Sequence, residues 1–377
     1  MARRLSLLHI YRLGIKELWS LWRDPIMLVL IVYTFTFAIY AAATAMPDSL
    51  RNAPIAIVDE DGSVLSGRIS AAFYPPHFLP AASIDLHQVD PLLDNGKYTF
   101  VLDIPPDFQR DVLAGKAPTI QLNIDATRMS QAFTGNAYVQ QIVMAEINEF
   151  VQHYRSEITS PIDLAIRARF NPALTESWFG SIMELINQIT ALSIILTGAA
   201  LIREREHGTV EHLLVMPVTP AEIMLAKIWS MGLVVLCATS ASLFLVIRGA
   251  LQVPIEGSIA LFLACTTLHL FATTSMGIFL ATVARSMPQF GLLIILFLLP
   301  LEMLSGGLTP RESMPAFARY IMTAAPTTHF VSAAQAILYR AADIRIVWPQ
   351  MLTLLVIGSV LFALSLARFR KALSSMA

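Results

Sequence analysis

The sequence has few charged residues, and it lacks the glycine-rich motifs of nucleotide-binding enzymes. Only 14% of its 377 residues are charged, whereas a soluble domain carries about 25%. This shortage excludes a soluble enzyme, and the absence of a concentrated basic region excludes a nucleic-acid-binding protein. No phosphate-binding loop, dinucleotide-binding fingerprint or serine-centred elbow occurs. The sequence therefore predicts no ATPase or other enzyme activity in this chain.

Cysteine is also scarce, and the two cysteines, Cys237 and Cys265, both lie in apolar runs. The polar part of the chain therefore has no disulfide. What is abundant is apolar: 55% of the residues are hydrophobic and the mean hydropathy is +0.62. The charges gather between residues 47 and 178, which hold 16 of the 27 acidic and 9 of the 26 basic residues. This composition predicts an integral membrane protein with one polar, acidic domain inserted near its start.

Six apolar stretches are long enough to cross a bilayer as helices, which takes about 20 residues. They cover residues 26–46, 182–202, 223–247, 258–284, 290–308 and 348–367. The first resembles a signal peptide, but its apolar run is too long and begins too late, so we expect a retained span. With the N-terminus inside, the inner segments collect 12 Lys and Arg residues and the short outer loops collect 5. Both termini are therefore predicted to be cytoplasmic, with the acidic domain outside.

The predicted fold is an α-helical integral membrane protein with six transmembrane helices and an α/β domain inserted between the first and second spans. Residues 1–25 form a basic amphipathic helix in the membrane interface, and residues 26–46 form the first transmembrane helix. Residues 47–181 form the extracytoplasmic α/β domain, and residues 182–377 form a five-helix transmembrane domain. Within the α/β domain we expect strands near 54–58, 97–104 and 119–125 and helices near 66–73, 107–114 and 130–156.

The segment between the second and third spans, residues 203–222, combines a charged cluster, one glycine and two closing prolines. Glu204 and His207 form a Glu-x-x-His pair, with Glu211 on the same helical face. A di-metal bundle needs two such pairs, so we expect no metal here. A short helix that presents charge to a protein partner explains the pattern better.

The segment after the fifth span, residues 300–326, is apolar but rich in glycine and proline. Irregular backbone at membrane depth is tolerated only when it is buried in protein or lines a cavity, which predicts re-entrant half-helices at an outer gate. The prolines would end each half-helix, and Gly306 and Gly307 would permit the reversal. Glu302 has two interpretations: a functional carboxylate within the membrane, or a water-facing residue that caps a helix.

Together these features resemble the type-2 ABC exporter permeases, in the bacterial multidrug-type branch with a large domain after the first span. The Glu-Arg-Glu-x-Gly-Thr segment carries the most specific similarity, and in that family it forms the coupling helix that docks on the ATPase subunit. The resemblance implies a coupling role for Arg203, Glu204, Arg205, Glu206, Gly208, Thr209, Glu211, Leu213 and Pro217. It also implies an outer gate at Pro300, Glu302, Gly306, Gly307, Pro310 and Pro326.

The implied function is the permease subunit of an ATP-driven exporter in the bacterial inner membrane, moving an amphipathic or hydrophobic small molecule that is drug-like or lipid-like. The chain would hold no cofactor, because ATP and magnesium belong to a partner ABC ATPase. Six spans supply one permease half, so a second half, identical or homologous, is expected, surrounded by membrane lipid. The outer domain would extend the exit path or hold a periplasmic adaptor. The alternative is a membrane-anchored sensor or assembly factor without transport, whose inner loops would need no charged helix closed by prolines.

Overall fold

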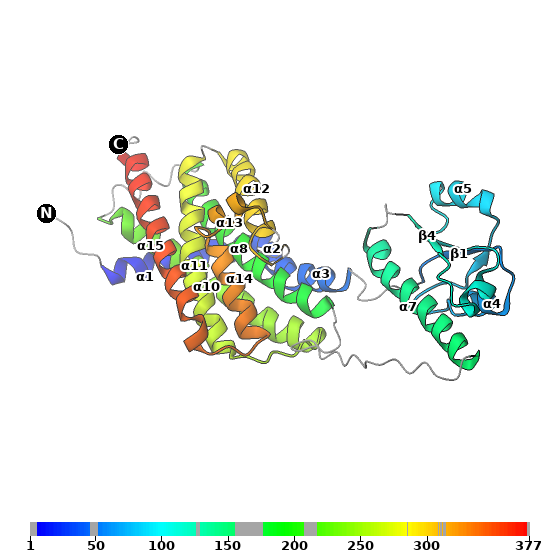
Figure 1. Ribbon diagram of the computed structural model, residues 1–377. Coiled ribbons are helices and arrows are strands. Elements are labelled where there is room, and N and C mark those ends of the chain that lie inside the picture. Colours follow the sequence, from blue (N-terminus) through cyan, green and yellow to red (C-terminus); the bar gives the residue numbers. More distant parts are fainter. Residues whose placement is uncertain are drawn as a thin grey trace. The chain divides into compact units, whose positions relative to one another are not determined.

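The computed structural model describes residues 6–45, 52–125, 129–154, 176–206, 217–284, 286–307, 309, 311 and 314–374. The chain divides into two compact units (Figure 1). Residues Met1–Met46 and Ala168–Ala377 form the helical unit, and residues Pro47–Arg167 form the sheet unit.

The sheet unit contains a four-stranded sheet in the order β2-β1-β3-β4. Its strands are β1 (Ile55–Asp59), β2 (Ala82–Ser83), β3 (Phe100–Ile104) and β4 (Gln121–Ile124). Its helices are α4 (Val64–Ala71), η2 (Leu86–Gln88), α5 (Val89–Asp94), α6 (Phe108–Leu113) and α7 (Met129–Tyr154). β1 pairs in parallel with β2 and β3, whereas β3 and β4 are antiparallel. Three strands and three helices lie within or beside the predicted ranges, and β2 and α5 were not predicted.

Alternation along the strands separates two apolar faces of this sheet. Ile57 and Leu102, which are paired in register, belong to the larger buried cluster with residues of α4, α6 and α7. Val58 and Val101 face the other side, in a smaller cluster with Val89 of α5. Two covered faces explain why β1 and β3 are almost continuously apolar.

The helical unit consists of long apolar helices that lie side by side (Figure 1). They are α1 (Leu7–Trp22), α2 (Pro25–Tyr33), η1 (Thr34–Ala38), α3 (Ile39–Ala45), α8 (Glu176–Glu206), α10 (Pro220–Ser242), η3 (Leu243–Ala250), α11 (Ile259–Val283), α12 (Met287–Met303), α13 (Ala316–Met322), α14 (Pro326–Leu338) and α15 (Ile344–Ser374). Within the described residues, five helical stretches are long and apolar enough to cross a membrane: Pro25–Thr44, Ser177–Glu206, Pro220–Ala250, Ile259–Val283 and Ile344–Lys371.

Two predicted boundaries are wrong. The span expected over residues 290–308 is α12, which has 17 residues and ends at Met303, because the chain then turns through Gly306 at φ +95°. At 1.5 Å per residue such a helix is about 25 Å long, short of a typical hydrocarbon core. The second correction concerns α8, which begins at Glu176, so the polar domain ends before residue 181.

The two ends of the helical bundle are built differently. At the end that we call the α1 end, Phe369 of α15 shares a buried cluster with Ile202 of α8, and Met287 of α12 packs against that cluster. At the opposite end, called the α14 end, the Tyr339 hydroxyl donates to the Phe179 carbonyl at 3.1 Å. Leu13 of α1 packs against the same cluster as Phe369, so α1 and the last turns of α15 lie at the same end of the bundle.

α8 and α11 are packed closely against each other between these two ends. A Cβ atom on Gly277 would lie 2.6 Å from the Ile194 carbonyl oxygen, so only glycine permits this approach. The Ser193 hydroxyl donates to Thr273 Oγ1 at 2.6 Å. Thr190 Oγ1 lies 2.9 Å from Nε2 of the buried His269. Small residues and interhelical hydrogen bonds are typical of helix packing within membranes.

Candidate functional site

Four consecutive charged residues end α8 at the α1 end, and they contact five neighbouring elements. They are the first residues of the predicted coupling segment: Arg203, Glu204, Arg205 and Glu206. Their contacts determine which helices are fastened to α8.

Glu204 belongs to a buried cluster of two carboxylates and two lysines. Its Oε1 lies 2.5 Å from Lys16 Nζ, and its Oε2 lies 2.8 Å from Lys227 Nζ. Lys227 Nζ also pairs with Glu17 Oε1 at 3.0 Å. Only 1% of Lys227, 5% of Glu17 and 8% of Glu204 are exposed. Buried charges are tolerated when they are paired, so this neutral cluster joins α1, α8 and α10.

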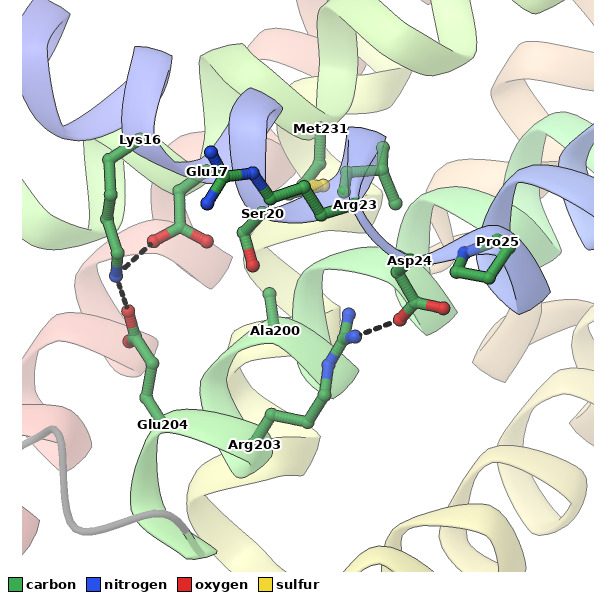
Figure 2. A pocket seen from close by; sticks show the side chains of 11 residues that line it. Lys16, Glu17, Ser20, Arg23, Asp24, Pro25, Ala200, Arg203, Glu204 and Met231 are labelled. Atoms are coloured by element: carbon green, nitrogen blue, oxygen red, sulfur yellow. Dashed lines mark hydrogen bonds and ion pairs between the residues drawn. The ribbon is translucent and has the colours of Figure 1, made fainter.

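Lys16 is the half-exposed member of the cluster. Burial lowers its pKa, but the carboxylates of Glu204 and Glu17 outweigh this effect and hold the pKa of Lys16 above its ordinary value. Lys16 therefore stays charged at neutral pH. Figure 2 shows its ammonium group between the two carboxylates, bridging α1 to α8.

Arg203 fixes the bend between α1 and α2. Its guanidinium pairs with the Asp24 carboxylate (Figure 2). Asp24 is also the N-cap of α2, because its Oδ1 accepts a hydrogen bond from Met27 N at 3.1 Å. The following Pro25 occupies the first helical position. The first span thus begins at a residue that is anchored to the end of α8.

Arg205 and Glu206 reach the junction between α11 and α12. Arg205 donates to the carbonyl oxygens of Ala281 and Ala284 at 3.1 and 2.9 Å, where the end of a helix leaves carbonyls without intrahelical partners. Glu206 Oε1 accepts a hydrogen bond at 2.9 Å from the backbone N of Met287, which is the first residue of α12. The two side chains therefore secure the end of α11 and the start of α12.

Another carboxylate, that of Glu222, secures the start of α10. It forms a capping box with Thr219, whose hydroxyl accepts from Glu222 N at 3.3 Å. Its Oε1 accepts from Ser6 N at 2.7 Å, next to the start of α1. The exposed Pro217 of the predicted coupling segment comes just before this cap.

α1 also packs tightly on α10. A Cβ atom on Gly14 would lie about 2 Å from the Trp229 ring, so α1 approaches the indole through its one glycine. Trp229 Nε1 donates to the Ile10 carbonyl at 3.2 Å, and the ring stacks with Tyr11 at a centroid distance of 6.1 Å. The described helix within the range predicted for residues 1–25, α1, is thus packed into the bundle.

A pocket of about 490 Å³ opens between α1 and the end of α8 (Figure 2). The Lys16–Glu204 pair lies on one side of it and the Arg203–Asp24 pair on the other, with Ser20 between them. The remaining lining consists of the charged Glu17 and Arg23 and of four apolar residues, Leu21, Pro25, Ala200 and Met231.

Four other residues of the predicted coupling set lie outside the described residues: Gly208, Thr209, Glu211 and Leu213. His207, the partner of Glu204 in the Glu-x-x-His pair, also falls outside them. Glu204 itself is paired with two lysines, so the structure gives this carboxylate an intramolecular role that the sequence did not reveal.

At the α14 end, one part of the gate prediction is wrong. Pro300 lies inside α12 and does not end it. Proline removes its own backbone donor and disturbs the preceding turn, but the following turn can form. Leu304 N donates to the Pro300 carbonyl at 3.0 Å, so the helix closes after the proline.

The chain bends at the predicted glycine pair. Gly306 has φ +95°, a conformation that favours glycine. A Cβ atom on Gly307 would lie 2.2 Å from the Met183 side chain of α8. The Ser305 hydroxyl supports the turn by donating to the Glu302 carbonyl at 2.8 Å.

α14 begins in the interior of the bundle. Pro326 is its first residue, and one turn later the Phe330 ring stacks on His269, in the middle of α11, with centroids 4.1 Å apart. From there α14 runs to Tyr339 at the α14 end. The N-caps of α13 and α14, Pro315 and Ala325, make no side-chain hydrogen bond, and the half-buried Glu302 lies near the end of α12. Pro310 lies outside the described residues.

Sequence reasoning missed the partners that hold the α1 end together: Glu17, Asp24, Glu222 and Lys227. One signal was available, because Lys227 falls inside the span predicted at residues 223–247. An ionisable residue within an apolar span usually has a buried partner. The identity of that partner required the tertiary structure, since Glu17 is 210 residues away in the chain.

A bundle of apolar helices with ionic contacts at one end and broken helices at the other defines a polytopic membrane protein. The family model described as ABC-2 family transporter protein matches residues 19–367. The chain belongs to this family, which confirms the predicted membership.

Three curated relatives extend over both units. The inner membrane transport permease YhhJ of Escherichia coli strain K12 is 61% identical over 369 residues, covering 98% of this chain and 99% of that protein. The probable multidrug ABC transporter permease YbhR of the same strain is 28% identical over 362 residues, covering 94% and 96%. The probable multidrug ABC transporter permease YbhS, also from that strain, is 29% identical over 275 residues, covering 71% of each chain.

Proposed function

We propose that this chain is the permease subunit of an ATP-driven exporter in the bacterial inner membrane. ATP and magnesium bind to a separate ABC ATPase, and a second permease half, a copy or a homologue, completes the transport path. The cargo is an amphipathic or hydrophobic small molecule. Relatives that are named inner membrane transport permease and probable multidrug ABC transporter permeases support this assignment.

In this proposal the α1 end faces the cytoplasm and α12 counts as the sixth crossing. The excess of Lys and Arg in the segments at this end supports the orientation. α1 and the last turns of α15 lie at one end of the bundle, which requires an even number of crossings and supports α12, although short, as the sixth. The sheet unit lies outside the membrane, where it extends the exit path or holds an adaptor.

The observation that carries the proposal is the fastening of five elements to the last turn of α8. Arg203 holds α2, Glu204 holds α1 and α10, and the next two residues hold α11 and α12. A force applied to the segment after Glu206 by ATPase closure would therefore reach several spans together. A lone membrane anchor has no need of such a junction.

The experiment is co-purification with the ABC ATPase and measurement of stimulated ATP hydrolysis. Glu206→Lys reverses an exposed charge at the α1 end, and Glu256→Lys reverses an exposed charge at the α14 end. We expect Glu206→Lys to lower stimulation about tenfold, which corresponds to about 1.4 kcal/mol, because a reversed charge at an interface opposes the complementary charge of the partner. Glu256→Lys should leave it unchanged. Equal stimulation by both variants would remove the coupling assignment.

A further inference from the structure

The pocket at the bend between α1 and α2 carries charges of both signs. Its cationic side chains are Lys16, Arg23 and Arg203, and its carboxylates are Glu17, Asp24 and Glu204. The two ion pairs that flank it fix one cation and one anion on each side. A ligand that fits such a lining carries a positive and a negative group at once.

Some of this lining is accessible from solvent. The side chains of Arg203 and Asp24 are 28% and 22% exposed, and Arg23 and Ser20 are exposed. Figure 2 shows the Ser20 hydroxyl directed into the space between the two ion pairs, above the small side chain of Ala200. Guanidinium groups bind phosphate oxygens through charge-assisted hydrogen bonds, and a carboxylate oxygen can accept more than one hydrogen bond.

The surroundings of the pocket are those of a membrane surface. Trp19 and Trp22, on α1, are 59% and 68% exposed, and tryptophan is enriched at the headgroup level. α2 starts at Pro25, on the pocket wall, and immediately exposes Ile26 and Val29 at 78% and 68%. A molecule in the pocket can therefore lay apolar chains along α2 while its polar group stays between the ion pairs.

We propose that this pocket binds the headgroup of a phospholipid that carries a primary ammonium group, such as phosphatidylethanolamine. The phosphate contacts the guanidinium groups of Arg23 and Arg203, and the ammonium group donates hydrogen bonds to the Asp24 carboxylate. A primary ammonium has three N–H donors, whereas the trimethylated headgroup of phosphatidylcholine has none. The bound lipid bridges the bend of α1 and α2 to the end of α8. This inference rests on the proposed function only for placing the α1 end at a membrane surface.

The test is native mass spectrometry of the purified full-length chain in an equimolar mixture of lipids with identical acyl chains. The mixture contains phosphatidylethanolamine, its monomethyl and dimethyl derivatives, phosphatidylcholine and phosphatidylglycerol. We expect the amount of lipid retained to fall with each methylation. Phosphatidylethanolamine should be retained about ten times more than phosphatidylcholine, a ratio worth roughly 1.4 kcal/mol. Phosphatidylglycerol, which lacks the ammonium group, should be retained as poorly as phosphatidylcholine.

Two matched variants locate the site. Ser20→Trp fills the pocket, whereas Ser359→Trp adds the same bulk on an exposed part of α15. We expect Ser20→Trp to abolish the preference and Ser359→Trp to keep it. Equal retention of all the lipids by the wild-type protein, or a preference for phosphatidylglycerol, would overturn the proposal without any variant. An unchanged preference in Ser20→Trp would place the lipid elsewhere and overturn it too. None of these outcomes depends on an ATPase, so they are separate from the test of the exporter assignment.

Discussion

The two ends of the helical bundle hold their helices together by different means. Ion pairs among the described residues of the helical unit all lie at the α1 end, where Lys227, Glu204 and their partners join three helices. At the α14 end the chain instead turns through Gly306 and passes back into the interior before Pro326. Ion pairs fix helix ends in one arrangement, whereas short helices joined by glycine turns can rearrange at lower cost. The comparison suggests a rigid end that receives force and a deformable end that opens.

The largest effect is expected from breaking the ionic cluster at its most buried member. Lys227→Met removes from Glu17 and Glu204 the buried lysine that they share, whereas the half-exposed Lys16 remains. Removing one partner of a buried ion pair costs about 3–5 kcal/mol. We expect a large drop in the thermal unfolding midpoint of the detergent-solubilised protein, measured by tryptophan fluorescence.

Two controls define that result. Lys16→Met removes an exposed lysine from the same cluster and should cost only about 1 kcal/mol. Adding Glu17→Gln to Lys227→Met should restore part of the loss, because it removes a stranded carboxylate. A Lys227→Met protein as stable as the Lys16→Met protein would show that the α1 end does not depend on this cluster.

A smaller effect is expected at the turn of the α14 end. Gly306→Ala places a Cβ in a left-handed conformation and should cost about 1–2 kcal/mol. Gly291→Ala is the matched control, since no atom lies within 4 Å of the position of its Cβ, inside α12. We expect Gly306→Ala to slow export from vesicles while the ATPase still co-purifies, and Gly291→Ala to export normally. Normal export by both variants would show that the turn at Gly306 has no role in the transport cycle.

The smallest structural change is Glu302→Gln, which removes one charge and keeps the shape of the side chain. Because the carboxylate is half-buried near the end of α12, we expect altered export with little change in stability. Transport rates in vesicles and unfolding midpoints, measured side by side, separate the two effects. Unchanged transport rates would show that the charge of Glu302 has no role in transport.

Hydrophobicity was enough to predict where most of the spans lie. Hydrophobicity alone carried the fifth predicted span to residue 308, although the glycine pair at 306 and 307 already indicated a turn, and α12 ends at Met303. Strand alternation and turn residues likewise predicted β1, β3 and β4, whereas the two residues of β2 are too few to give a pattern.

The candidate site was predictable only in part, for a physical reason. The run from Arg203 to Glu206 stood out because its charges interrupt apolar sequence. Its buried partners, Glu17 and Lys227, come from distant segments in which one charge is as compatible with the surface as with the interior. Pairing between such residues depends on how the helices pack, and the sequence pattern of each helix does not contain that information.

The most direct test of the difference between the two ends is photocrosslinking to the ABC ATPase. A benzoylphenylalanine side chain replaces Glu206 at the α1 end in one variant and Glu256 at the α14 end in the other, both at exposed positions. After irradiation of the assembled complex, the permease–ATPase adduct is detected by mass on a denaturing gel. We predict an adduct from position 206 and none from position 256. An adduct from position 256 alone would contradict both the orientation and the assignment of the α1 end as the force-receiving end.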